Sequence, residues 1–108
     1  MTIDNFNELN KDIIRQCFKL LNDKGHDYTE AGTDALANFK LVSSRVGLSP
    51  LQVWSVYFTK HIDSLDTYIK KGELKSETID SRIQDSINYL LLLNALVKEK
   101  ENNIEKQS

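Results

Sequence analysis

His61 is a candidate for a binding or catalytic role, because a histidine can bind a ligand or transfer a proton. It belongs to a row of largely aromatic residues. The row comprises Trp54, Tyr57, His61, Leu65 and Tyr68, which recur at steps of three and four residues. Such steps place side chains on one face of a helix. A histidine there can be a ligand, or it can be a core-edge residue bonded to a backbone carbonyl. For a lone histidine the second interpretation is the more common one.

A polar row follows in the last third of the chain, made up of Glu77, Ser81, Asp85 and Asn88. Asp85 is also a helical neighbour of Arg82 and Tyr89. At a surface, an Arg82–Asp85 pair would contribute at most about 0.5 kcal/mol to stability. Buried, it would call for a partner, a metal or a ligand, because an uncompensated buried charge costs several kcal/mol. The apolar residues that flank the row favour partial burial.

The signatures of most enzyme classes are absent from the sequence. It has no phosphate-cradling glycine loop, no paired cysteines, no His-Glu-x-x-His motif and no serine in a nucleophile elbow. The His26-Asp27 doublet resembles that of metal phosphohydrolases, but those enzymes carry a further histidine before the doublet and none precedes it here. Cys17 lies on an apolar helical row, where an inert core thiol is more common than a nucleophile.

Length and composition indicate one small domain that spans residues 1–108. A formal charge of -2 and a pI of about 5.6 argue against a duplex nucleic-acid binder, which would carry a basic face. The single cysteine allows no internal disulfide, and residues 1–15 lack the pattern of a signal peptide. The longest apolar run, Leu90 to Leu93, is far shorter than the roughly 20 residues that span a bilayer. We expect a cytoplasmic protein without membrane association.

Helical periodicity predicts an all-α, compact bundle of about four helices, over residues 4–24, 35–46, 50–71 and 77–100. The expected N-terminal caps are short polar residues: Asp4, Asp34, Ser49 and Ser76. The expected C-terminal turns fall at glycines: Gly25, Gly47 and Gly72. Ser49-Pro50-Leu51-Gln52 is the strongest local signal, because it combines a capping box with proline at the first helical position. The polar tail from about residue 99 is expected to fray.

The apolar positions of these four segments define the expected core. For the first two helices they are Phe6, Leu9, Ile13, Cys17, Leu20, Leu21, Leu36, Phe39, Val42 and Val46. For the last two they are Leu51, Trp54, Phe58, Ile62, Leu65, Ile69, Ile79, Ile83, Ile87, Leu90, Leu91 and Val97. Because four consecutive leucines cover every side of a helical turn, Leu90–Leu93 favours a homo-oligomer. Coverage of the outer leucines by the first helix is an equally good explanation.

The segment from Gly25 to about Asp34 is longer than the roughly 2–8 residues that usually join two helices. It contains His26, Asp27 and Tyr28. Surplus length in a polar and aromatic loop indicates a function.

Several short motifs of the sequence, taken in order, resemble a pattern found in small all-helical bacteriophage proteins. These residues and dipeptides are Lys24, Asp27-Tyr28, Asn38-Phe39, Lys60-His61, Glu77, Arg82, Asp85 and Asn88-Tyr89. The similar proteins include the nucleotide-modification-associated domains, some of which resemble the MazG-like helical nucleotide pyrophosphatases. The resemblance covers about residues 11–97. Each of its short motifs is common by itself, so its specificity rests on their order and spacing.

The resemblance implies a phage subunit that handles a nucleotide in the cytoplasm of a bacterial host. The ligand-binding residues would be Lys24, Asp27, Tyr28, Asn38, Lys60, His61, Arg82, Asn88 and Tyr89. Tyr28 would stack on a base or wall off the pocket, and Asn38 would bond the ligand or brace the loop. Lys60, His61 and Arg82 would meet phosphate oxygens. Any metal, with magnesium the natural choice, would be held weakly by Glu77 and Asp85.

The sequence departs from the pyrophosphatase pattern at its acids. Those enzymes hold magnesium with Glu-x-x-Glu and Glu-x-x-Asp pairs on two helices. Here the third helix offers only Asp63 and Asp66, and Asp85 is followed by Asn88 where a second acid would stand. We therefore expect a nucleotide binder without catalysis, which would sequester a nucleotide or a cyclic nucleotide signal. The alternatives are a magnesium-dependent pyrophosphohydrolase and a structural or protein-binding phage subunit.

Overall fold

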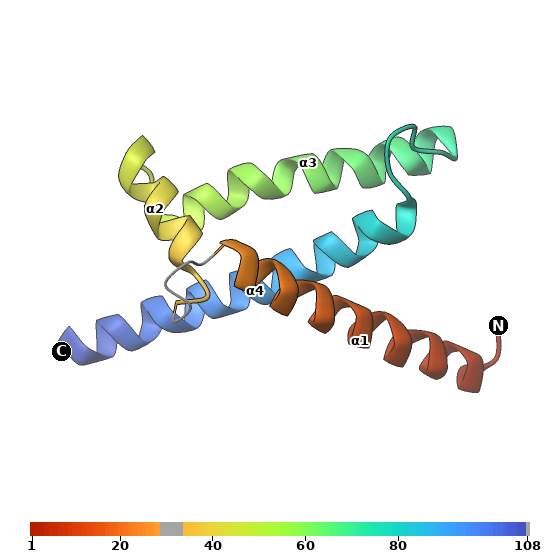
Figure 1. Ribbon diagram of the computed structural model, residues 1–108, viewed down its shortest axis with the longest axis horizontal. Helices are drawn as coiled ribbons and strands as arrows, with labels where there is room; N and C mark the ends of the chain where they lie inside the picture. Colours follow the sequence, from red (N-terminus) through yellow and green to blue (C-terminus); the bar gives the residue numbers. More distant parts are fainter. Residues whose placement is uncertain (29–33, 108) are drawn as a thin grey trace.

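The fold was analysed in a computed structural model that describes the backbone of residues 1–28 and 34–107. Side chains are described for residues 1–23 and 34–104. The element order is α1 (Ile3–Tyr28), α2 (Ala37–Val46), α3 (Pro50–Lys71) and α4 (Ile79–Gln107) (Figure 1). No strand occurs in the described residues. The all-α prediction and the number of helices are therefore confirmed.

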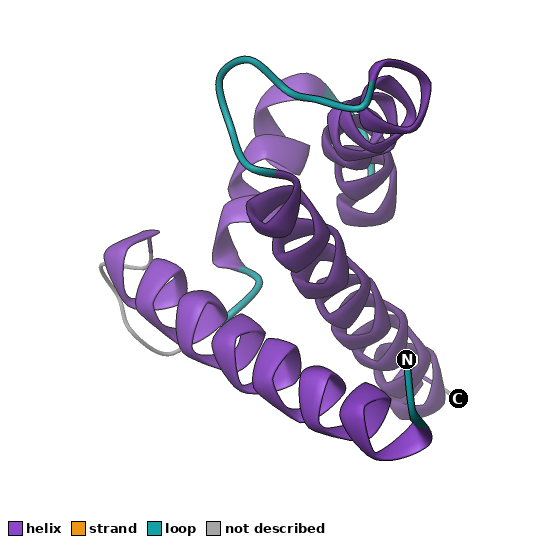
Figure 2. Ribbon diagram, turned by 90° about the vertical axis from the view of Figure 1, so that its right-hand side faces the viewer, coloured by secondary structure: helices purple, strands orange, loops and turns teal. Residues whose placement is uncertain are grey.

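The helices form an open arrangement around the α3–α4 pair. α2 packs against α3, and α1 packs against α4 (Figures 1 and 2). The N-terminal half of α1 diverges from α4 beyond the point where the two helices cross (Figure 1). The radius of gyration is 16.3 Å, whereas a compact domain of about 100 residues has a radius of roughly 13 Å. The bundle is therefore less compact than the sequence predicts.

The start and the end of α3 lie where the sequence places them. The Ser49 hydroxyl accepts a hydrogen bond from the Gln52 N–H at 3.2 Å, and the Gln52 side chain accepts one from the Ser49 N–H at 2.9 Å. Gly72 ends the helix in the left-handed conformation, with φ of 77°. Gly47 ends α2 in the same way, with φ of 72°.

The other helix ends differ from the predictions. α1 continues through Gly25 to Tyr28, because one glycine inside a helix costs only about 1 kcal/mol. Its first turn is capped by Thr2 rather than Asp4, since the Thr2 hydroxyl accepts from the Asn5 N–H at 3.1 Å. Residues 25–28 of the proposed functional loop are thus helical, and residues 29–33 lie outside the described residues.

Leu36, rather than the expected Asp34, is the N-cap of α2. The Asp34 carboxylate accepts from the Leu36 N–H at 2.9 Å, which forms a local turn just before the helix begins. In α4, Thr78 replaces Ser76 as the cap, with its hydroxyl accepting from the Ser81 N–H at 3.1 Å. α4 also runs to Gln107 instead of ending near residue 100. Its last turns contain strong helix formers and an i,i+3 ion pair between Lys98 and Glu101.

The core is smaller than expected and centres on the α2, α3 and α4 contact. Its buried members are Leu36, Phe39, Val53, Trp54 and Leu96. Expected core residues that lie exposed instead are Phe6, Leu9, Val46, Ile62, Ile69, Ile83, Leu90 and Leu91. They are exposed because each helix contacts one or two neighbours, so a full apolar stripe is never covered.

Trp54 occupies the middle of this core. Its indole N–H donates to the Tyr89 carbonyl oxygen at 2.7 Å, and its ring stacks on Phe58 with centroids 4.6 Å apart. Truncating a buried aromatic side chain of this kind lowers the free energy of unfolding by about 3–5 kcal/mol. Removing a helix cap lowers it by about 1 kcal/mol. Packing around Trp54 therefore contributes more to stability than any single helix end.

None of the helices, over the residues described, has the length and apolar character needed to cross a membrane.

The capping box of α3 gives a direct test of the fold. Ser49→Ala removes the acceptor of the Gln52 N–H, so we expect the free energy of unfolding to fall by about 1 kcal/mol in urea titrations. Ser55→Ala is the matched control, because the Ser55 hydroxyl only donates to the Gln52 carbonyl oxygen. The control should stay within about 0.5 kcal/mol of the parent protein. Equal losses in the two variants would contradict the role assigned to the cap.

Candidate functional site

Arg82 is the centre of the candidate site, on the first turn of α4. Its side chain is only 13% exposed, and its Nε forms an ion pair with the Glu77 carboxylate. Its Nη1 lies 3.2 Å from the Nδ1 atom of His61 on α3. Because a guanidinium group only donates hydrogen bonds, Nδ1 is the acceptor of this bond. The pair therefore links α3 to α4.

His61 is 2% exposed and lies among aromatic rings. The Tyr89 ring from α4 is 4.6 Å away at 49°, and the Phe58 ring, one turn earlier on α3, is 6.2 Å away. The spacing of Trp54, Phe58 and His61 along α3 turns all three toward α4. The histidine is thus buried, as a core-edge residue would be, and its Nδ1 bonds the charged side chain of Arg82.

Asn88 is a second buried polar residue of α4, at 5% exposure. No described residue donates a hydrogen bond to its side-chain oxygen. Buried polar groups are normally satisfied, so this amide is a natural partner for a group from outside the described residues.

The remaining predicted ligand-binding residues lie apart from Arg82 or outside the description. Lys60 is exposed, although the neighbouring His61 is buried. Asn38 is exposed on α2, where it lines an open hollow of about 490 Å³ formed by residues of 34–44. Lys24, Asp27 and Tyr28 lie in the last turns of α1, and their side chains are outside the described residues. The structure therefore brings together His61, Arg82 and Tyr89.

The two acids expected to hold a metal have different surroundings. Glu77 pairs with Arg82, so the Arg82–Asp85 pair expected from sequence is replaced by an Arg82–Glu77 pair. Asp85 faces the α1–α4 contact, where its charge acts on Cys17. Among the described residues, no three histidine, cysteine or acidic side chains gather closely enough to hold a metal ion. The residues described thus do not fit a magnesium site of the pyrophosphatase kind.

An ion-pair network between α2 and α4 was missed by the sequence reasoning. Lys40 lies 2.7 Å from Asp34 and 2.7 Å from Glu99. The hydrogen bond from Lys40 lowers the pKa of Asp34, and the same bond raises the pKa of Lys40. All three side chains are about two-fifths exposed, so the pairs contribute little to stability. No periodic signal could reveal the network, because Glu99 is distant in sequence.

Comparison with protein families, characterised proteins and solved structures finds no match to this chain. The site is therefore interpreted from its own residues.

Cys17 provides a test of the α1–α4 contact. Its thiol is 1% exposed, and its Sγ lies 3.8 Å from the Gln84 carbonyl oxygen. Burial, followed by the charge of Asp85, raises the pKa of Cys17. Because only the thiolate is reactive, we expect the native protein to react far more slowly with Ellman's reagent than the urea-unfolded protein at the same pH.

Asp85→Asn is the companion variant for this measurement. It removes the smaller cause of the raised pKa and leaves the burial of Cys17, so the thiol of the native variant should stay protected. Equal reaction rates for the folded and unfolded parent protein would show that α1 does not cover Cys17.

Proposed function

We propose that this chain is a nucleotide-binding protein that holds a phosphate group at Arg82. The single observation that carries the proposal is the almost buried guanidinium of Arg82, with His61 on one side and Glu77 on the other. Arginine in a partly dehydrated site binds phosphate strongly, through parallel charge-assisted hydrogen bonds.

The position of Glu77 supports an anion site at the Nε side of the Arg82 guanidinium. Its carboxylate occupies the Nε side of the guanidinium, where phosphate oxygens would bind. Glu77 is 38% exposed and Arg82 13% exposed, so Glu77 can turn into water when a ligand replaces it. Binding then replaces the Arg82–Glu77 ion pair with an arginine–phosphate pair. The binding free energy of the phosphate is therefore smaller than it would be at an arginine without an ion-pair partner.

Other groups would recognise the rest of the nucleotide. Tyr89 lies against His61 and offers an aromatic edge beside the phosphate position. Asn88 offers a buried amide. From the resemblance alone, Lys24, Asp27 and Tyr28 would close the site from the end of α1, with Tyr28 stacking on the base. Asn38 and Lys60 are exposed at a distance from this cluster and would act only at its periphery.

Binding without hydrolysis is favoured over the pyrophosphohydrolase alternative. Magnesium at phosphates is usually held by one or two carboxylates. The described acids offer Glu77 and Asp85, and Glu77 already neutralises Arg82. By analogy with phage proteins that sequester cyclic nucleotide signals, the biological role would be sequestration.

Two single variants at the ion pair test the proposal. Arg82→Gln removes the phosphate donor and should weaken nucleotide binding by about tenfold or more, the value of a charge-assisted bond. Glu77→Gln removes the internal competitor and should tighten binding. Arg45→Gln is the matched control for charge, because Arg45 lies exposed in the last turn of α2.

The measurement is calorimetry against mononucleotides, dinucleotides and cyclic dinucleotides, with and without magnesium, and with product analysis. Melting temperatures recorded in parallel separate loss of fold from loss of binding. If no nucleotide binds better than millimolar, the nucleotide proposal is wrong. If a monophosphate and pyrophosphate are released, the enzyme alternative replaces the binder. If both variants lose stability and neither changes binding, the Arg82–Glu77 pair is only structural.

A protein-binding subunit is the second candidate, favoured by the apolar residues that α1 and α4 leave exposed. Ile14 and Phe18 on α1 are 55% and 57% exposed, and Leu90 and Leu91 on α4 are 51% and 41% exposed. The occupant that suits these exposed residues best is a second copy of the chain, because each copy has the same apolar side chains to cover.

Light scattering tests this second candidate. We expect a homo-oligomer at micromolar concentration, and Leu90→Gln should shift it toward the monomer while helicity is retained. Ile69→Gln is the control, since Ile69 is an exposed apolar residue in the last turn of α3. A monomer at high micromolar concentration would contradict the oligomer.

A further inference from the structure

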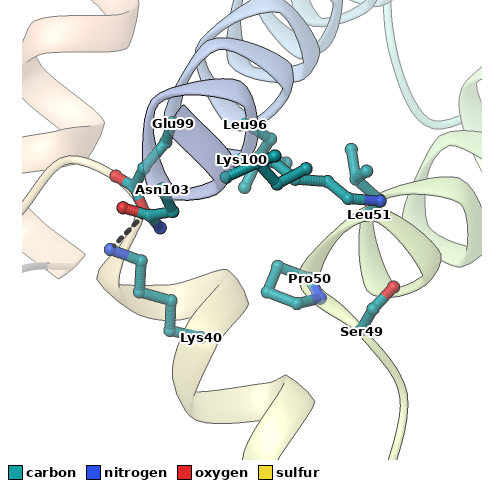
Figure 3. A pocket seen from close by; sticks show the side chains of 9 residues that line it. Lys40, Ser49, Pro50, Leu51, Leu96, Glu99, Lys100 and Asn103 are labelled. Atoms are coloured by element: carbon teal, nitrogen blue, oxygen red, sulfur yellow. Dashed lines mark ion pairs between the residues drawn. The ribbon is translucent and has the colours of Figure 1, made fainter. Parts of the chain in front are cut away.

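A pocket lies where α2, the start of α3 and the last third of α4 meet, away from Arg82 (Figure 3). Its volume is about 320 Å³, at the lower end of the range for small-molecule sites, roughly 300–1,000 Å³. Its walls include the apolar side chains of Pro50, Leu51, Leu96 and Ile104. Such a lining suits a ligand with a small apolar body.

The polar groups of the pocket are divided between two sides. On one side Lys40 is neutralised, because it contacts both Asp34 and Glu99 at 2.7 Å. On the other side Lys100 extends from α4 across the pocket toward Leu51 (Figure 3). No carboxylate among the described residues forms an ion pair with Lys100. The first turn of α3 has a partial positive charge of the same sign as Lys100.

This arrangement favours one class of ligand. The apolar walls would take a hydrocarbon body, and the Lys100 ammonium would attract an anionic head group at the mouth. A cationic head group would be repelled there, and a neutral one would gain nothing from Lys100. The Asn103 amide, also in the lining, lies beside Glu99 and Lys40 on the other side of the pocket (Figure 3).

We propose that this pocket binds a small amphipathic anion, a medium-chain carboxylate in chemical class, with its carboxylate at Lys100 and its chain against Leu96 and Ile104. The site is independent of the nucleotide proposal, since it shares no residue with the Arg82 cluster. Either proposal can fail without the other.

The test uses sodium octanoate as the probe, below its micelle concentration, in a nuclear magnetic resonance titration of the isotope-labelled protein. We expect saturable shifts centred on Leu51, Leu96 and Ile104. Octylammonium has the same chain and the opposite charge, and it should bind more weakly than octanoate. Octanol provides the neutral comparison and should fall between the two.

Two variants assign the contacts, each with a control on an exposed residue. Lys100→Gln should lower octanoate affinity by up to about fivefold, the upper limit for an exposed ion pair. Lys98→Gln, on the same helix and paired with Glu101, should leave the affinity unchanged. Ile104→Asp should abolish binding, whereas Ile69→Asp, at another exposed isoleucine, should not.

Two outcomes would overturn the proposal. Equal affinity for octanoate and octylammonium would remove the role of Lys100. Shifts centred on Phe6, Leu9 and Phe18 would show that the probe only coats the exposed apolar face of α1. Ile104 is itself exposed, so its variant is expected to fold, and an unchanged melting temperature would verify this.

Discussion

The hydrogen bond from the Trp54 indole to the Tyr89 carbonyl oxygen sets how α3 lies on α4, and the other contacts depend on that register. Phe58 stacks on Trp54, and Phe39 of α2 meets the Tyr89 ring edge-on at 6.3 Å. A buried indole N–H left without an acceptor is costly, so sliding one helix along the other is opposed by both packing and hydrogen bonding. The same register places His61 beside Arg82.

The open shape follows from how little surface each helix shares. α1 meets α4 mainly around Cys17, and Gln84 of α4 bonds Gln16 of α1 at 2.6 Å. The N-terminal half of α1 has no neighbour in the described structure (Figure 1). A large contiguous patch of exposed apolar side chains often marks a binding surface. A partner on this face would therefore complete the bundle that the helical periodicity predicts.

Two charge networks lie at opposite ends of the α3–α4 pair and differ in solvation. Arg82 is almost buried, so its ion pair with Glu77 acts in a medium of lower dielectric constant than water. Lys40 and its two acids are partly exposed, where solvent screens such pairs. In the proposed function a phosphate would therefore gain most at Arg82, whereas the α2 end has an apolar pocket in which Lys100 forms no ion pair with a described carboxylate. The two proposals therefore assign different ligands to the two ends.

The sequence by itself determined features that depend on a few adjacent residues. These include the capping box at Ser49, the left-handed ends at Gly47 and Gly72, and four helices in the predicted order. It could not decide which apolar stripes are covered, because Phe6 and Leu90 have the same pattern as buried residues and differ only in their neighbours. It also placed His61 and Arg82 in separate rows. Only the packing of α3 on α4 brought these two side chains within 3.2 Å, since residues distant in sequence have no periodic signal in common.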